Sequence, residues 1–263
     1  MEVQLNGARI HYKRSGAGFP VVFLHAGVAD SRMWESQIAG LAKDFDVIAP
    51  DMRGYGESEL PAAGWSATED VLALMGALGL REAPHMVGCS IGGKAAIDFV
   101  LEHPERVSKL VLVGAGIGGE PYDESNEYLF EEVTAAEEAN DLAAVNQAEM
   151  KLWLVGVGRT VDHVDKRLQG LFLDMNGRAL RSDFAGAPQG KLEPPAFGRL
   201  DEIKAPTLVI VGDHDLPDIK ASADVLVSRI RGARKAVIQD AAHLPNLEHP
   251  KEFNRLLLDF LNG

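Results

Sequence analysis

Residues 88–92 carry the sequence G-C-S-I-G, which follows a short apolar run and precedes a helical pattern. A G-x-S-x-G sequence in this context is typical of a nucleophile elbow, a strained strand-to-helix turn that exposes a serine hydroxyl. Gly88 and Gly92 are expected where the turn brings neighbouring backbone too close for a Cβ atom. We therefore predict that Ser90 is a nucleophile. The alternative is a small structural residue in a glycine-rich turn.

Serine attack requires a general base, because a neutral hydroxyl is a poor nucleophile at neutral pH. The chain has eight histidines, and His243 follows the apolar run 235–238 after a short loop and precedes the last helical pattern. This position predicts His243 at a strand end, where a base for Ser90 is needed. His214 is the rival by position. Structural or surface roles are expected for the histidines in or beside regular elements, namely His11, His85, His103, His163 and His249.

A carboxylate must hold the imidazole in one tautomer and stabilise its protonated form. The sequence G-D-H-D at residues 212–215 follows the apolar run 208–211, so its carboxylates are expected at the same sheet edge as the serine. We predict that Asp215 is the partner of the histidine. Asp213 and Asp218 are the alternatives, and the competing interpretation of each is a residue that only caps its loop.

The negative oxygen formed by serine attack needs backbone N–H donors. The elbow supplies one, the N–H of Ile91, which directly follows the nucleophile. The second donor is expected from residues 25–27, H-A-G, which follow the apolar run 21–24. We predict the Gly27 N–H as this donor, with Ala26 as the alternative, because small residues let the main chain approach a substrate closely.

Positioning these groups requires strands that end at one edge of a sheet. Short apolar runs alternate with longer helical patterns, which predicts a mostly parallel central sheet flanked by helices. An Asn-Gly pair at residues 6–7 predicts an antiparallel hairpin at the start. An amphipathic helix is expected over the last segment. The six buried runs are residues 21–24, 47–49, 85–87, 110–113, 208–211 and 235–238.

The alternation stops between residues 117 and 203, where helical patterns occur without a convincing strand. Because this stretch lies between two predicted strands, we expect a helical cap folded over the strand ends rather than a separate domain. The predicted α/β core then consists of residues 1–116 and 204–263, and the cap insertion of residues 117–203.

Several apolar side chains of this predicted cap could contact a substrate. Trp153, Phe172 and Met175 either line an apolar substrate pocket or pack the interior of the cap. His25, at the end of the first buried run, is expected to line the same pocket from the core. The sequence leaves both interpretations of the cap residues open.

The composition argues against several classes of protein. Twenty-six basic and 39 acidic side chains give a net charge of -13, which repels nucleic acids and anionic membranes. No apolar stretch reaches transmembrane length and the first residues lack a secretory signal, so a cytoplasmic protein is expected. The single cysteine, Cys89, permits no internal disulfide and is expected to be a buried structural thiol. A homo-oligomer is compatible with the sequence.

Together these motifs resemble the capped α/β-hydrolase superfamily, which includes esterases, enol-lactonases, carbon-carbon bond hydrolases and haloperoxidases. The resemblance covers nearly the whole chain and rests on the elbow, on the chain order Ser, Asp, His, and on residues 51–58, D-M-R-G-Y-G-E-S. The chain departs from the family at His25-Ala26, where His-Gly is usual. The resemblance implies no metal and no organic cofactor.

We predict that the protein hydrolyses an ester or lactone-type carbonyl in a small, apolar substrate, through an acyl-enzyme on Ser90 that water then releases. Three alternatives use the same residues: carbon-carbon bond hydrolysis, cofactor-free perhydrolysis, and a ligand receptor that retains an intact triad. Fold and triad alone do not choose among them.

Overall fold

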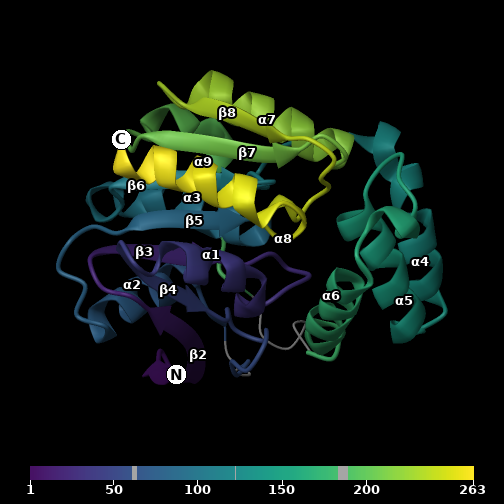
Figure 1. Cartoon of the computed structure of the whole chain (residues 1–263), viewed down its shortest axis with the longest axis horizontal. Coiled ribbons are helices and arrows are strands. Elements are labelled where there is room, and N and C mark those ends of the chain that lie inside the picture. The colour runs from purple at the N-terminus through teal and green to yellow at the C-terminus, as the bar shows by residue number, and fades with distance from the viewer. Residues whose placement is uncertain (61–63, 122, 183–188) are drawn as a thin grey trace.

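The computed structural model describes residues 1–60, 64–121, 123–182 and 189–263 (Figure 1). In these ranges, eight strands form one sheet in the order β1-β2-β4-β3-β5-β6-β7-β8. The strands β1 to β4 span Glu2–Leu5, Ala8–Ser15, Phe19–Leu24 and Phe45–Pro50. The strands β5 to β8 span His85–Cys89, Lys109–Val113, Thr207–Gly212 and Arg234–Ile238.

The pairing pattern confirms a mostly parallel sheet with an antiparallel start. The pairs β1·β2 and β2·β4 are antiparallel, whereas β3, β4, β5, β6, β7 and β8 pair in parallel. Asn6 and Gly7 have φ of 45° and 81°, the left-handed values that a tight hairpin turn requires. Strands β4, β5 and β7 are buried along their whole length, which explains their continuous apolar sequences.

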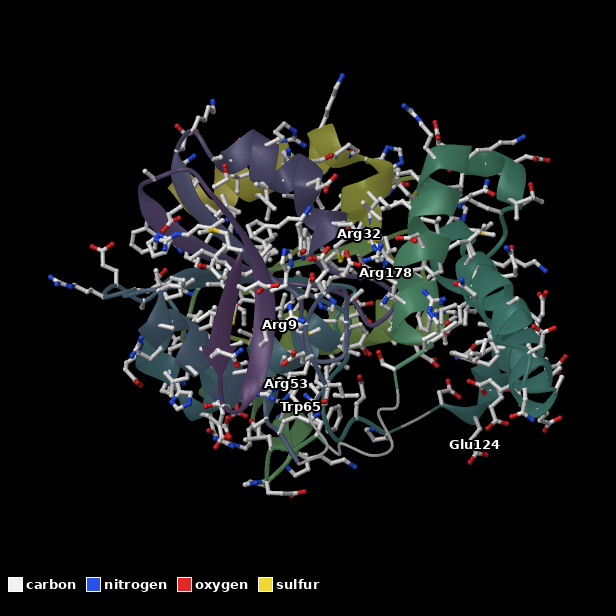
Figure 2. All side chains as sticks on the ribbon, turned by 90° about the horizontal axis from the view of Figure 1, so that it is seen from below. Arg9, Arg32, Arg53, Trp65, Glu124 and Arg178 are labelled. Atoms are coloured by element: carbon white, nitrogen blue, oxygen red, sulfur yellow. The ribbon has the colours of Figure 1, made fainter. Side chains whose placement is uncertain are left out.

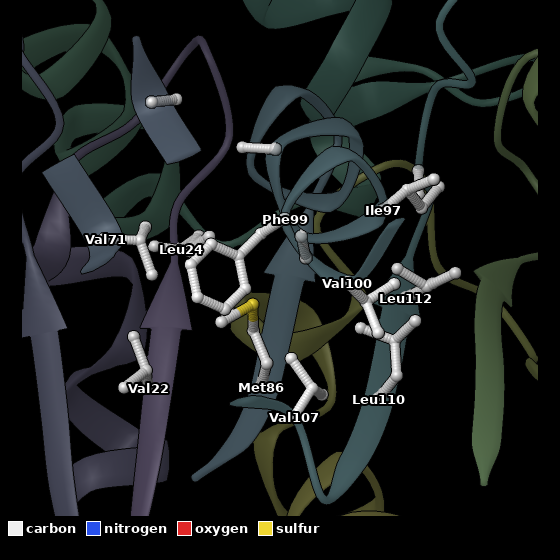
Figure 3. Packing of buried hydrophobic residues seen from close by; sticks show 14 of the residues in the cluster. Val22, Leu24, Val71, Met86, Ile97, Phe99, Val100, Val107, Leu110 and Leu112 are labelled. Atoms are coloured by element: carbon white, nitrogen blue, oxygen red, sulfur yellow. The ribbon is translucent and has the colours of Figure 1, made fainter. Parts of the chain in front are cut away.

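Helices cover both faces of the sheet. On one face lie α2 (Ala67–Ala77), α3 (Ile91–Glu102) and α7 (Pro217–Arg229), and on the other α1 (Glu35–Leu41) and α9 (Pro250–Asn262). The short helix α8 spans Pro245–Glu248. Figure 3 shows how Phe99 of α3 packs on Met86 of β5 in the core beneath α2 and α3. The buried hydrophobic side chains thus form two layers, one on each face of the sheet.

A helical segment, defined here as Glu124–Ala179, follows β6 and lies beyond the ends of the strands (Figure 1). It contains η3 (Glu124–Phe130), α4 (Glu131–Glu138), α5 (Leu142–Glu149), η4 (Met150–Val155), η5 (Val161–His163) and α6 (Lys166–Ala179). The short turns η7 (Ala196–Gly198) and η8 (Leu200–Glu202) lead back to β7. The domain boundaries at residues 117 and 203 remain predictions, and residues 122 and 183–188 lie outside the described ranges.

Polar contacts join this helical segment to the core. Arg32, in η1 (Ser31–Trp34), donates through Nη1 to Asp174 Oδ2 of α6 at 2.5 Å, and Arg178 Nε lies 3.3 Å from the same oxygen. Figure 2 shows Arg32 and Arg178 near each other where α6 meets the core. Just after α6, Ser182 Oγ donates to the Gly54 carbonyl at 2.5 Å. These contacts hold α6 beside the loops that follow β3 and β4.

No helix in the described ranges combines the length and the apolar character that crossing a membrane would require.

Candidate active site

Ser90 lies on the sharp turn between β5 and α3. Its backbone has φ 54° and ψ -117°, a strained left-handed conformation for a residue with a side chain. A Cβ atom at Gly88 would lie 2.3 Å from the Gly92 carbonyl oxygen, and one at Gly92 would lie 2.4 Å from the Leu24 oxygen. The two glycines are therefore required for the turn to close, as the G-x-S-x-G pattern predicts.

His243 and Asp215 form a buried pair at the ends of two neighbouring strands. His243 follows β8 and Asp215 follows β7, and each has a relative exposure of 1%. The imidazole Nδ1 lies 3.0 Å from both carboxylate oxygens of Asp215. The Leu216 N–H also donates to Asp215 Oδ1, at 2.8 Å. This geometry favours the tautomer that carries its proton on Nδ1, and it leaves the lone pair of Nε2 free to accept a proton.

His243 Nε2 is buried and has no hydrogen-bond partner among the described residues. An unpaired buried polar atom costs free energy, so its presence calls for a functional explanation. The Ser90 hydroxyl does not donate to this nitrogen here. Catalytic hydrogen bonds are often long in enzymes without substrate.

The end of β6 connects the serine to the histidine pair. The Ser90 N–H donates to the Val113 carbonyl at 2.9 Å, and the next residue, Gly114, lies beside the imidazole. A Cβ atom at Gly114 would lie 3.0 Å from His243 Nδ1 and 3.1 Å from Asp215 Oδ2, and its φ of 48° also favours glycine. Gly114 was not predicted as a site residue, although its position directly after a buried run was an available signal.

The rival residues have other partners. Asp213 Oδ1 accepts from the Ala241 N–H at 3.2 Å, and Asp218 Oδ1 accepts from the Asn126 side chain at 2.5 Å. His214 Nδ1 lies 2.8 Å from the Val157 carbonyl oxygen, to which it donates. Of the three carboxylates considered, Asp215 is the one that contacts His243 in the described part of the chain.

Two backbone donors lie beside the elbow. A Cβ atom at Gly27 would lie 3.3 Å from Ile91 Cδ1, so the two residues are neighbours. The N–H groups of Gly27 and Ile91 donate to no acceptor among the described residues. The Ala26 N–H, in contrast, points to Met33 Sδ at 3.3 Å. The geometry therefore favours Gly27 over Ala26 as the second donor to an oxyanion.

The structure differs from the expectation that His25 lines the substrate pocket. His25 has no exposed surface, and both ring nitrogens are engaged: Nδ1 lies 2.8 Å from the Ala26 carbonyl, and Nε2 accepts from the Met52 N–H at 2.8 Å. Its ring packs edge-on against the Tyr55 ring, with the two ring centroids 4.9 Å apart. Burial lowers the pKa of His25, which keeps the ring neutral. His25 therefore braces the strand-end loops instead of facing a ligand.

The two predicted pocket residues of the helical segment have different environments. Phe172 has no exposed surface and, with Met175, packs into the core layer that contains α9. This favours the packing interpretation for both residues. Trp153 is only partly buried, and its ring centroid lies 4.6 Å from that of His243. Its carbonyl accepts from the His243 N–H at 3.2 Å, so Trp153 contacts the proposed base directly.

An ion pair missed by sequence analysis supports the His243 loop. Arg159 Nη2 lies 2.8 Å from Glu248 Oε2, and the two side chains are only 3% and 6% exposed. Glu248 Oε1 accepts from the Ala242 N–H at 2.7 Å, directly before the histidine. Burial raises the pKa of Glu248, against the opposing effects of the Ala242 N–H and the Arg159 charge. The ion pair thus ties the helical segment to the base.

A cavity of about 220 Å³ opens beside the elbow. Its walls are largely apolar and aromatic, and its polar groups include the Lys94 ammonium and the Gln189 amide. Trp65, labelled in Figure 2, lines the cavity and also packs against the core cluster beneath α2 and α3. The lining residues are Met52, Tyr55, Trp65, Ile91, Lys94, Ala95 and Gln189. None of these residues was predicted to line a pocket. Met52, Tyr55, Trp65 and Gln189 come from segments distant in sequence from the elbow.

Cys89, next to the nucleophile, is fully buried and directs its Sγ toward the His243 carbonyl at 3.8 Å. Burial raises the pKa of the thiol well above its usual value, so a thiolate is disfavoured. In the described residues, no group of three or more His, Cys, Asp or Glu side chains could hold a metal ion.

The fold and the elbow define an α/β-hydrolase, and comparison with known proteins agrees. The family model described as the alpha/beta hydrolase fold matches residues 20–250. The chain therefore belongs to the α/β-hydrolase family, and it is a hydrolase.

Similar proteins fall into several hydrolase groups. The chain is 31% identical over 281 residues to a 2-hydroxy-6-oxo-6-phenylhexa-2,4-dienoate hydrolase of Burkholderia cepacia, covering 100% of this chain and 94% of the relative. A solved N-acyl homoserine lactone degrading enzyme is 30% identical with a TM-score of 0.78, covering 99% of this chain and 100% of the other. The enol-lactonase from Burkholderia xenovorans LB400 is 25% identical with a TM-score of 0.81, covering 100% of both chains.

Proposed function

We propose that the protein hydrolyses an ester or lactone carbonyl of a small, largely apolar molecule through a covalent acyl-enzyme on Ser90. The observation that carries this proposal is the unpaired, buried Nε2 of His243, whose other nitrogen is held by Asp215. A base in this state beside a strained serine turn is the arrangement that activates a hydroxyl for attack on a carbonyl.

In the first half of the reaction, His243 Nε2 takes the Ser90 proton while Oγ forms a bond to the carbonyl carbon. The carbonyl π electrons move onto oxygen, which the Gly27 and Ile91 N–H groups then stabilise. When the tetrahedral intermediate collapses, the bond to the leaving oxygen breaks, and His243 returns the proton to that oxygen. Asp215 stabilises the imidazolium throughout, without taking its proton.

In the second half, water replaces the alcohol. His243 removes one proton from water as the hydroxide oxygen bonds to the acyl carbon, and the same N–H groups stabilise the new oxyanion. Collapse then breaks the bond to Ser90 Oγ, which regains its proton from His243 and leaves a carboxylic acid. No cofactor enters this sequence of steps.

A second candidate is hydrolysis of a carbon-carbon bond in a vinylogous diketone. It is favoured by the 31% identity, over the full length of this chain, to a 2-hydroxy-6-oxo-6-phenylhexa-2,4-dienoate hydrolase. The ester or lactone assignment is supported by the similarity to a lactone-degrading enzyme and an enol-lactonase. Both candidates need the same serine and base, so substrate turnover distinguishes them.

The test is active-site labelling combined with a substrate panel. A fluorophosphonate should modify Ser90, as located by peptide mass spectrometry, and Ser90→Ala should abolish both labelling and turnover without altering circular dichroism. The adjacent variant Cys89→Ala should retain labelling. Esters, lactones and vinylogous diketones of increasing acyl size then identify the substrate class. Full turnover by folded Ser90→Ala would refute the proposal, whereas labelling without turnover of any substrate would favour a receptor.

A further inference from the structure

The cavity beside the elbow contains a cation that the proposed reaction does not use. Lys94 lines the cavity of about 220 Å³ together with Met52, Tyr55 and Ile91. Among its described lining residues, Lys94 is the one basic side chain. Apart from Gln189, the other lining residues are apolar or aromatic, so Lys94 is the charged side chain that a ligand would meet among the described residues of this cavity.

Lys94 lies one helical turn beyond the nucleophile. Its backbone N–H donates to the Ser90 carbonyl at 2.9 Å, so the two residues are separated by about 6 Å along the axis of α3. Lys94 and Gln189 also line a second cavity, of about 450 Å³, which continues along the same helix. Lys94 therefore lines both cavities. The first cavity is also lined by Ile91, the residue directly after the nucleophile.

The ammonium is held in place and keeps free donors. Lys94 Nζ donates to Asp98 Oδ2 at 2.8 Å, and the Asp98 side chain is 9% exposed. An ammonium has three N–H donors, and within the described part of the chain Lys94 donates to Asp98, which leaves two donors for a ligand. The Lys94 side chain is 35% exposed, so these donors are accessible to a ligand.

The position of the base indicates which part of a substrate enters this cavity. His243 must protonate the leaving group, and the Trp153 ring packs beside that of His243, with centroids 4.6 Å apart. The cavity lies instead on the side of Ile91 and is not lined by His243 or Trp153. It is therefore placed to receive the acyl part of the substrate, with the carbonyl carbon at Ser90.

We propose that Lys94 is a specificity-determining residue that binds a carboxylate at the far end of the acyl chain, so that the preferred substrates are monoesters or lactone-type derivatives of short dicarboxylic acids. This inference rests on the proposed function for the identity of the acyl group. The overall charge of -13 disfavours anionic ligands in general, so a preference for them requires a local cation.

Binding to Ser90→Ala protein tests the inference without turnover. Monomethyl adipate and methyl hexanoate have acyl chains of equal length and differ in the terminal carboxylate. By calorimetry, the anionic ligand should bind about tenfold or more tightly, in line with a charge-assisted hydrogen bond. In the Ser90→Ala background, Lys94→Met should abolish this preference and Lys94→Arg should retain much of it. Lys191→Met is the matched control, because Lys191 lines the second cavity but not the first.

The outcomes separate the inference from the proposed function. Equal binding of the two ligands, or a preference that survives Lys94→Met in folded protein, would overturn the role of Lys94. Loss of the preference in Lys191→Met instead would do the same. A Lys94-dependent preference in a protein that hydrolyses neither p-nitrophenyl ester of these acids would support the anion site and contradict ester hydrolysis. With turnover, the ratio of kcat/KM for the two p-nitrophenyl esters should fall in Lys94→Met.

Discussion

Two loops of the molecule each bury a histidine at a strand end, yet they use it differently. His25 follows β3 and has backbone partners for both ring nitrogens, Ala26 and Met52. His243 follows β8 and has a partner for Nδ1, while Nε2 has none in the described part of the chain. Burial is almost the same, at 0% and 1% exposure. The difference shows that an incomplete set of hydrogen bonds, and not burial, distinguishes a candidate base from a structural brace.

Replacing the two histidines should give the largest contrast. His243→Ala should lower kcat by about four orders of magnitude or more while the protein stays folded, because the proton acceptor is lost. His25→Ala should cost about 1–3 kcal/mol of unfolding free energy, because the buried Met52 N–H loses its acceptor, and should reduce kcat far less. Denaturant titration and ester kinetics measure both effects. A folded His25→Ala protein as inactive as His243→Ala would mean that His25 has a direct catalytic role.

The acid partner provides the next largest effect. Asp215→Asn should lower kcat by about 10⁴-fold, because an amide favours the imidazole tautomer with the proton on the wrong nitrogen. Asp213→Asn is the matched control on the same loop, and its effect should be mild, because Asp213 accepts from the Ala241 N–H and does not contact His243 in the described part of the chain. Steady-state kinetics of the two variants decide the assignment. The reverse result would transfer the role to Asp213.

A smaller effect is expected from crowding the imidazole. Gly114→Ala places a methyl group 3.0 Å from the His243 ring and strains a backbone with φ of 48°. The displaced base should lower kcat by about 10²-fold, the usual cost of a misplacement near 1 Å. At Gly116 an added Cβ would have no described atom within 4 Å apart from its chain neighbours, so Gly116→Ala should leave kcat close to that of the parent. Equal kcat in the two variants would show that the His243 imidazole can be displaced without loss of activity.

The smallest effect concerns stability and pH. Burial, aided by the Lys109 charge, lowers the pKa of His85 to about 4, and burial also lowers the pKa of His25. The unfolded chain therefore binds more protons below about pH 6.5, and the folded state loses stability as the pH falls toward 4. Urea unfolding at about pH 7.5 and about pH 5.5 should show this loss. His85→Gln should make the pH dependence shallower, and an unchanged dependence would contradict the assignment.

Local patterns made the sheet and the elbow predictable. The G-x-S-x-G sequence requires a particular turn, and apolar runs such as 110–113 specify buried strands because both faces of the sheet are covered. The contact between Asp215 and His243 was also predicted, since both follow such runs. These predictions rest on the position of a residue relative to its own strand, which the sequence contains.

Contacts between distant segments were not predictable from one sequence. Phe172 could have faced a ligand or the core, and only the placement of α6 beside α5 and η4 shows that it packs. The brace role of His25 depends on Met52, which belongs to another strand end. Gly114 matters because the imidazole of His243 happens to rest on it. Each case depends on the register between elements, and a periodic pattern along one element carries no such information.

The buried pair of Arg159 and Glu248 has a consequence for protein engineering. Arg159 also donates to the carbonyls of Leu154, Val155 and Asp240, so one side chain joins the helical segment to the loop that carries His243. Removing one member of a buried ion pair leaves the other charge buried without a partner, which is strongly destabilising. The helical segment is therefore not an interchangeable module: a chimera that imports this region from a relative must bring an arginine at the same place, or replace Glu248 as well.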